Sequence, residues 1–256
     1  MKKYSILMYN FNNYEIMHEP EELDPECDYI YVTDDPTLKS DKWRIVIDPD
    51  LDGMSTFEKC YAVRFNLFKY AKTDVCIYMD GNFQIHKSLR KLYDDFMASG
   101  AELGVHVHFA RTQMVPEYAT WVNMRGYPQE QAFLCLGWME AQNYDLQYKG
   151  LYEGSFRICK NTDTTRMIDK MTLGALKHSL LIHDGYPIER LDQTLYSFIL
   201  NRWFDDTVKI FPISPKFFFN GFLSHCAHKS NWPLPDISEF DTKGWVFNKE
   251  VDLYVG

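Results

Sequence analysis

The sequence has no Cys-X-X-Cys pair and no apolar run near the roughly 20 residues that span a bilayer. Its six cysteines are scattered, a pattern that argues against a disulfide framework and favours a reducing compartment. After Lys2 and Lys3 the first apolar run ends at Asn10, too soon for the core of a signal peptide. We therefore expect a cytoplasmic protein without a transmembrane segment, either free or peripheral at the inner face of the membrane.

Positive charge is also in short supply. Lys and Arg together number 27 against 36 Asp and Glu, which gives a formal net charge of −9. Broad electrostatic binding to nucleic acid depends on clustered Lys and Arg, so we expect no nucleic-acid partner. Much of the acidic surplus falls in residues 19–28 and 34–41, stretches typical of solvated faces. This balance still leaves room for a local basic pocket that binds a phosphate.

Internal repeats, low-complexity tracts and flexible linkers are absent as well, which favours one folded unit. Short apolar runs closed by turn residues predict strands, and amphipathic stretches predict helices. The predicted strands are residues 4–9, 29–33, 43–47, 75–79, 83–85, 103–109, 151–159 and 208–213. The predicted helices are residues 57–71, 164–180 and 187–203. This order predicts an α/β fold with a Rossmann-like, mostly parallel mixed sheet flanked by helices.

The best-defined predicted helix carries an arginine within its apolar stripe. Ser55 and Glu58 form a capping box at its start, and apolar residues then repeat at helical spacing through Ala71. Arg64 falls in the middle of this apolar side, where an unpaired guanidinium would be very costly to bury. Arg64 therefore pairs either with a buried structural carboxylate, or with a phosphate or the acids of a functional site.

Two acidic residues stand at positions that favour a site. Asp80 and Gly81 directly follow the continuous apolar run 75–79, and ligands of open α/β sheets bind beyond the carboxyl ends of the strands. Gly81 allows close approach of backbone or a positive φ. Asp192 projects along the edge of the apolar face of the last predicted helix. We expect Asp80 to lie at the ligand-binding end of its strand and the Asp192 carboxylate to point toward the interior of the protein.

Two histidines alternate with valines in the strand predicted at residues 103–109. The alternation predicts Val105 and Val107 on one face of the sheet and His106 and His108 on the other. Histidines in such a strand are more often structural than metal ligands. Their functional interpretation therefore depends on the other residues of the chain.

Glycosyl transfer from a nucleotide sugar requires groups of the kinds found here. A divalent cation held by carboxylate and imidazole, helped by Lys or Arg, neutralises the departing diphosphate. The groups that the sequence offers for this are Asp80, Arg64, Asp192 and the pair His228-Lys229. Each one alone is typical of an ordinary structural role, and their order along the chain is the more specific signal.

The order of short motifs resembles a known family. The chain contains, in this order, the segments IYMDGNFQI, HFAR, EGSF, LDQTLYSF and AHKSNW. They resemble the GT-A glycosyltransferase-like family first described as a domain of unknown function, which includes plant Golgi enzymes of mucilage and pectin synthesis. The resemblance runs from about Asn10 to Lys229. It implies a GT-A-type fold, a nucleotide-sugar donor such as a UDP-sugar, and Mn²⁺ or Mg²⁺ as cofactor. It also implies one domain over residues 1–256, with a nucleotide-sugar-binding half (about 1–110) and an acceptor half (about 111–256) that ends in a closing loop.

Residue by residue, the resemblance implies three sets of site residues. The implied catalytic residues are Asp192, Gln193 and Glu153. The residues implied to bind the donor are Asn10, Phe11, Tyr14, Arg64, Asp80, Gly81, His108, Arg111 and Lys229. The implied metal ligands are Asp80, Asn82 and His228. Two positions depart from the family pattern: Asn82 replaces the second acid of an Asp-X-Asp motif, and Leu191 replaces the Arg of Arg-Asp-Gln.

These departures keep other functions open. The leading hypothesis is a glycosyltransferase of surface polysaccharide synthesis, with a glycan or glycoconjugate acceptor. Asn82 and Leu191 favour a second hypothesis, a catalytically silent GT-A-like module that binds a nucleotide or a glycan. A metal-dependent phosphoesterase is a third, although the acids and histidines are not as dense as in a two-metal site. Neither the sugar, the acceptor nor the oligomeric state follows from the sequence.

Overall fold

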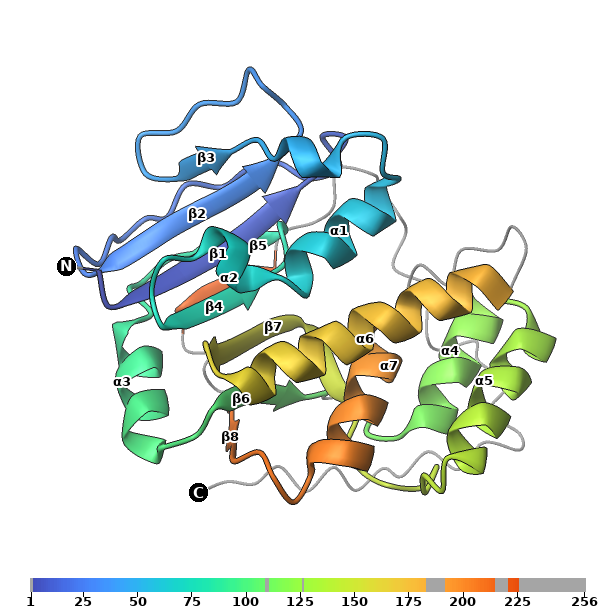
Figure 1. Ribbon diagram of the computed structural model, residues 1–256. Helices are drawn as coiled ribbons and strands as arrows, with labels where there is room; N and C mark the ends of the chain where they lie inside the picture. Colours follow the sequence, from blue (N-terminus) through green and yellow to red (C-terminus); the bar gives the residue numbers. More distant parts are fainter. Residues whose placement is uncertain (1, 109–110, 126, 183–191, 215–220, 226–256) are drawn as a thin grey trace.

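The computed structural model describes residues 2–108, 111–125, 127–182, 192–214 and 221–225. In this part of the chain a seven-stranded sheet has the order β3-β2-β1-β4-β7-β6-β8 (Figure 1). Its strands are β1 Tyr4–Asn10, β2 Cys27–Thr33, β3 Arg44–Val46, β4 Val75–Met79, β6 Leu103–Val107, β7 Tyr152–Lys160 and β8 Ile210–Pro212. Two more strands, β5 Phe83–Ile85 and β9 Leu223–His225, form a separate antiparallel pair.

Strand β7 runs against the direction of its neighbours in the sheet. Strands β1 to β4 pair in parallel, β6 pairs in parallel with β8, and β7 lies antiparallel between β4 and β6. The start of β7 therefore lies at the edge of the sheet where β1, β4 and β6 end. A backbone hydrogen bond of 2.9 Å from Asp80 N to Ser155 O joins the two segments there.

Helices flank this sheet on both faces. They are α1 Thr56–Arg64, α2 Leu67–Tyr70, α3 Arg90–Ser99, α4 Met114–Arg125, α5 Gln129–Ala141, α6 Asp163–Ile182 and α7 Asp192–Ile199, with short helical turns at Pro49–Leu51 and Leu200–Phe204. Helices α1, α2, α6 and α7 cover one face, and α3 with the β5–β9 pair covers the other (Figure 1). The predicted fold class, α/β with a mostly parallel mixed sheet flanked by helices, is confirmed.

Burial on both faces explains why the central strands have apolar residues at consecutive positions of the sequence. Along β1, Leu7 and Tyr9 belong to the core under α1 and α6, whereas Ile6 and Met8 belong to the core under α3. A strand covered on both sides needs apolar residues at every position, in contrast to the alternation of a half-exposed strand. The run Val75–Met79 follows this pattern and forms β4 with the predicted bounds.

The prediction of one helix over residues 57–71 is wrong. The capping box of Ser55 and Glu58 is present, but α1 ends at Arg64 and the chain bends through Phe65 before α2. In a continuous α-helix the carbonyl of Arg64 would accept the N–H of the residue four positions later. The guanidinium Nη2 of Arg157 donates to that carbonyl instead, and the Arg157 guanidinium lies 5.3 Å from the centre of the Phe65 ring. A residue from β7 therefore satisfies a carbonyl at the end of α1.

The predicted two-faced alternation of residues 103–109 is also wrong. The register between β6 and β7 shifts between Val105 and Val107, and a shift of this kind disrupts the regular alternation. Val105 is buried while Val107 is 41% exposed, and His106 and His108 are both buried. The two valines thus differ in environment, and both histidines lie inside the protein.

The other helices and strands match their predicted bounds to different degrees. Strand β7 and helix α6 match the predictions within two residues at each end. Helices α3, α4 and α5 and strand β9 were not predicted. The helix predicted at residues 187–203 is described only from Asp192, where α7 begins, and it continues in π-helical turns at Leu200–Phe204. The predicted closing loop lies mostly outside the described residues.

Two global expectations concern cysteines and membranes. The five cysteines within the described residues are free thiols, as expected: Cys27, Cys60, Cys76, Cys135 and Cys159. Within the same residues no helix is long and apolar enough to cross a membrane.

Candidate functional site

A cavity opens at the edge of the sheet where β4 ends and β7 begins. The space among its lining atoms is about 260 Å³, a figure that includes open solvent, so the hollow itself is small. Its lining residues are Arg64, Phe65, Glu153, Gly154, Arg157, Asp192, Gln193 and Tyr196. They come from the end of α1, the start of β7 and the start of α7, three segments that are far apart in sequence. All three residues predicted as catalytic, Asp192, Gln193 and Glu153, line this cavity.

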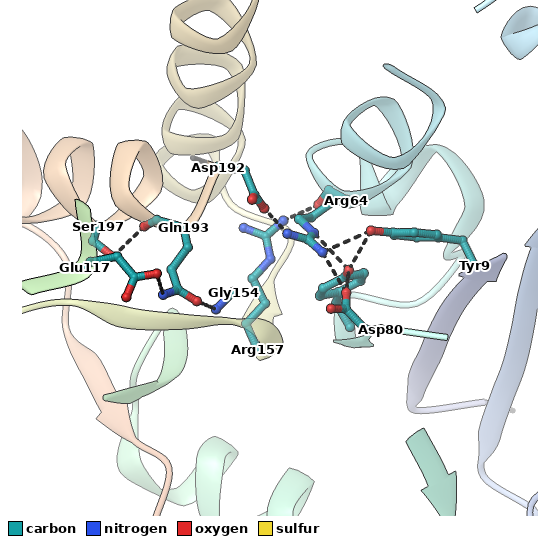
Figure 2. Close-up of polar contacts among 10 residues, drawn as sticks. Tyr9, Arg64, Asp80, Glu117, Gly154, Arg157, Asp192, Gln193 and Ser197 are labelled. Carbon is teal, nitrogen blue, oxygen red and sulfur yellow. Dashed lines mark hydrogen bonds and ion pairs between the residues drawn. The ribbon is translucent and has the colours of Figure 1, made fainter. Parts of the chain in front are cut away.

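Arg64 is the centre of the polar network beside the cavity (Figure 2). Its Nη2 lies 2.6 Å from Oδ1 of Asp80, and its Nη1 donates to Oδ2 of Asp192. Two tyrosines complete its surroundings: Nε donates to the hydroxyl of Tyr78 at 2.8 Å and Nη2 to that of Tyr9 at 3.0 Å. Arg64 is thus paired with two carboxylates, Asp80 and Asp192, both of which the sequence analysis singled out.

The electrostatics of Arg64 follow from this arrangement. Its side chain is only 12% exposed, and burial alone would lower its pKa, but Asp80 and the two tyrosines outweigh burial and raise that pKa well above its usual value. The guanidinium therefore stays charged. One positive charge faces two carboxylates, so the network has no surplus positive charge for an anion.

Gly81 follows Asp80 at a place with no room for a side chain. A Cβ at this position would lie 2.4 Å from the backbone oxygen of Tyr9, closer than such atoms ever approach. Close backbone approach, expected from the sequence, is therefore the reason for glycine here. It lets the segment after β4 lie directly against the end of β1.

Gln193 is held through both ends of its amide. The backbone N–H of Gly154 donates to Oε1 of Gln193 at 2.9 Å, and Nε2 of Gln193 donates to Oε1 of Glu117 at 3.3 Å. Because a backbone N–H can only donate, the first contact identifies which end of the amide is the oxygen. The amide therefore has one defined orientation at the cavity wall.

His108 and Arg111 lie on the other side of Glu153. The backbone N–H of Arg111 donates to Nδ1 of His108 at 3.0 Å. The other ring nitrogen, Nε2, lies 3.4 Å from Oε2 of Glu153 and 3.0 Å from Nη2 of Arg111. Burial and the nearby charge of Asp80 raise the pKa of Glu153. A carboxylate of raised pKa beside a neutral imidazole is suited to accept or release a proton.

Acidification is expected to destabilise the protein through its buried histidines. Burial lowers the pKa of His106 to about 4, and burial together with Arg111 lowers that of His108 to about 3. In the unfolded chain both pKa values return to about 6.5, so below that pH the unfolded state binds more protons and stability falls. The loss is complete only below the two lowered pKa values. The measurement is the free energy of urea unfolding from about pH 7 to about pH 4. This free energy should fall less steeply with decreasing pH in His108→Asn than in the parent. Equal slopes of unfolding free energy against pH would show that His108 does not contribute to the fall.

The residues predicted to bind the donor near the end of β1 have mixed environments. Asn10 uses its amide to close a loop, since Nδ2 donates to Glu15 O at 2.8 Å and Oδ1 accepts from Glu15 N at 2.9 Å. Phe11 is 2% exposed and its ring stacks on Tyr9, so in this structure it supports the loop and has no surface for a ligand. Tyr14, 44% exposed, is the one of the three that a ligand can reach.

The predicted metal ligands can be tested only in part, because His228, like Lys229, lies outside the described residues. Within those residues no group of three or more His, Cys, Asp or Glu is placed to hold a metal ion. Asp80 uses Oδ1 for Arg64 and Tyr78, and its side chain is 31% exposed. Asn82 is 7% exposed, and its buried Oδ1 has no hydrogen-bond partner among the described residues. Mg²⁺-type sites often use one or two protein oxygens plus substrate phosphates, so these two residues fit such an ion.

Sequence reasoning missed several residues of the site. Arg157 lies in the middle of a predicted buried strand, and a charge at such a position signals a buried partner in the same way as Arg64. Its partner is Asp169 on α6, with Nη1 to Oδ1 at 2.6 Å. Glu117 on α4 gave no comparable signal, because α4 itself was not predicted.

Comparisons with known proteins add little to this geometry. No protein-family model matches the sequence, and no protein of curated function matches it. Among solved structures, the crystal structure of mouse xyloside xylosyltransferase 1 in its apo form is similar, with a TM-score of 0.46 and 10% sequence identity. The similarity covers 83% of this chain and 85% of that chain. Membership in the family that the motifs resemble stays a prediction.

Proposed function

We propose that this protein transfers a sugar from a nucleotide sugar, a UDP-sugar by the sequence resemblance, to a glycan or glycoconjugate acceptor. The observation that supports this most is the meeting of Arg64, Asp192 and Gln193 at one cavity, with Asp80 paired to Arg64 beside it. The order of motifs in the sequence selected these residues as one site, and they come from segments that only the fold brings together. The cavity also lies beyond the carboxyl end of β4, where open α/β sheets bind their ligands.

The carboxylates of the cavity have suitable roles in such a reaction. During transfer, the bond from the anomeric carbon to the diphosphate breaks, a bond to the acceptor oxygen forms, and the acceptor hydroxyl loses a proton. Positive charge develops on the sugar ring, and fixed carboxylates stabilise it. In the proposal Asp192, oriented by Arg64, lies against the donor sugar. Glu153, whose pKa is raised by burial and by Asp80, takes the proton of the acceptor.

The departing diphosphate needs positive charge that Arg64 does not supply, because Asp80 and Asp192 already match its charge. The proposal therefore includes Mn²⁺ or Mg²⁺ held by Asp80 and Asn82, with Lys229 and His228 as further groups implied by the sequence. When bound, the cation would neutralise the diphosphate. The buried Oδ1 of Asn82, which has no partner within the part of the chain that the structure describes, supports this part of the proposal.

UDP is expected to stabilise the protein against heat, and Mn²⁺ is expected to increase the effect. A ligand that binds only the native state adds about 2.7 kcal/mol at a hundredfold excess over its Kd. For a domain of this size that corresponds to roughly 5 to 10 °C in Tm. The measurement is a thermal melt with and without UDP and Mn²⁺.

A matched variant separates the metal-dependent part of this stabilisation. Asp80→Asn keeps the shape of the side chain and removes its charge, so it should lose the increment due to Mn²⁺ and keep its fold. If no nucleoside diphosphate shifts the Tm of the parent, with or without metal, the proposal fails. A Mn²⁺ increment that persists in Asp80→Asn would remove Asp80 from the metal site.

A second function is favoured by one specific observation. Asn82 provides a neutral ligand where the family motif has an acid, which weakens the affinity of the site for a cation. A module that binds a nucleotide or glycan without transferring a sugar would tolerate this change. Stabilisation by UDP without turnover of any nucleotide sugar would support that module.

A further inference from the structure

Glu117 is a buried acid that the proposed reaction does not use. It lies on α4 and its side chain is 2% exposed. Three donors converge on its carboxylate: Nε of Arg111, Nε1 of Trp121 at 2.8 Å and Nε2 of Gln193 at 3.3 Å. A carboxylate is an acceptor at every lone pair, so it can satisfy all three. An amide or hydroxyl at this position could not present acceptors in all three directions.

The contacts of Gln193 show what Glu117 does for it (Figure 2). The backbone of Gln193 is fixed without Glu117. The hydroxyl of Ser197 donates to Gln193 O at 2.7 Å and accepts from Tyr152 N at 2.9 Å. Its side chain is fixed at Oε1 by the N–H of Gly154. Nε2 of Gln193 donates to the carboxylate of Glu117, and the two contacts together determine the orientation of the amide.

We infer that Glu117 is a positioning residue: it holds the Gln193 amide at the cavity wall in one orientation and thereby links α4 to the site. This inference rests on the function proposed above, because the orientation matters only if Gln193 contacts the donor or acceptor. Glu117 itself does not line the cavity.

Three substitutions at or near Glu117 separate positioning from simple structural support. Glu117→Met keeps the volume and removes the acceptor, and it should lower kcat for sugar transfer about 10- to 100-fold, the usual cost of losing a residue that orients a site residue. Glu117→Gln loses the ion pair to Arg111 but keeps an oxygen for Gln193, so it should recover most of that loss. Trp121→Phe removes another donor to Glu117 and leaves the contact with Gln193, and it should lower stability more than kcat.

A double-mutant cycle tests whether Glu117 acts through Gln193. Glu117→Met should reduce kcat in the parent but change it less than about twofold in a Gln193→Ala background, because the amide that it positions is gone. Equal losses in both backgrounds would overturn the inference. So would equal activities of Glu117→Met and Glu117→Gln at equal stability, since that result indicates a purely structural role.

The same four proteins separate a failure of this inference from a failure of the proposed function. The urea midpoints of the parent, both single variants and the double variant report the contact itself, whether or not sugar is transferred. If the parent transfers no sugar, the proposed function is contradicted. If the urea midpoints of the four proteins are then still non-additive, Glu117 still holds Gln193. Additive midpoints together with additive kcat values would overturn the inference.

Discussion

Asp192→Asn is expected to lower the rate of sugar transfer about 10²- to 10⁴-fold, the range covered by a positioned acid or base group. Asp192 begins α7, its side chain is 10% exposed, and it lines the cavity beside Gln193. The asparagine keeps the shape and one oxygen toward Arg64, and it removes the negative charge that would face the donor sugar. The measurement is the initial rate at saturating donor.

A matched control for this variant is Asp94→Asn. Asp94 is an exposed carboxylate on α3, paired with Arg90, on the other face of the sheet. The variant Asp94→Asn should leave the rate of sugar transfer unchanged. A fall of less than about threefold in Asp192→Asn would exclude Asp192 from the chemistry.

Asp169→Asn is expected to cost about 3 to 5 kcal/mol of unfolding free energy. Asp169 on α6 and Arg157 on β7 are both nearly fully buried, with Nη1 of Arg157 2.6 Å from Oδ1 of Asp169. Removing the carboxylate leaves the guanidinium buried without its counter-charge, stacked between Phe65 and Tyr196. The measurement is urea unfolding at neutral pH.

The matched control is an exposed ion pair of the same type. Asp28 and Arg44 join β2 to β3 at the surface, with Arg44 44% exposed, so Asp28→Asn should cost less than about 1 kcal/mol. A similarly small cost in Asp169→Asn would show that the buried pair contributes little. A large cost would show that the buried pair stabilises the fold, next to the end of α1, where Arg157 binds the carbonyl of Arg64.

The sequence allowed the sheet and several members of the site to be predicted, for physical reasons that are easy to identify. Strand β4 was predicted with its full bounds because both of its faces are buried and a turn comes directly after it. Arg64 and Asp192 were singled out because a charge in an apolar stripe requires a partner, and the structure makes them partners of each other. Sequence periodicity cannot show which strand runs antiparallel, so Glu153 was assigned to the site from the resemblance alone.

The features that could not be predicted depend on tertiary contacts. At the end of α1 the carbonyl of Arg64 accepts from Arg157, which is 93 positions away. Helix α5 has exposed apolar side chains, Phe133 and Leu134 among them, so its sequence lacks the one-sided pattern that marks a surface helix. Glu117 lies on the neighbouring α4, and nothing in its local sequence indicates that it meets Gln193, 76 positions later.

The most direct test of sugar transfer is a screen of nucleotide sugars that measures released nucleoside diphosphate. The parent protein and Asp192→Asn are incubated with each UDP- and GDP-sugar in the presence of Mn²⁺, with and without candidate glycan acceptors. If the protein is a glycosyltransferase, at least one donor, expected to be a UDP-sugar, releases its diphosphate with the parent, and the variant abolishes this release. Release at the same rate from both proteins, or no release from any donor under any of these conditions, would contradict the proposed function.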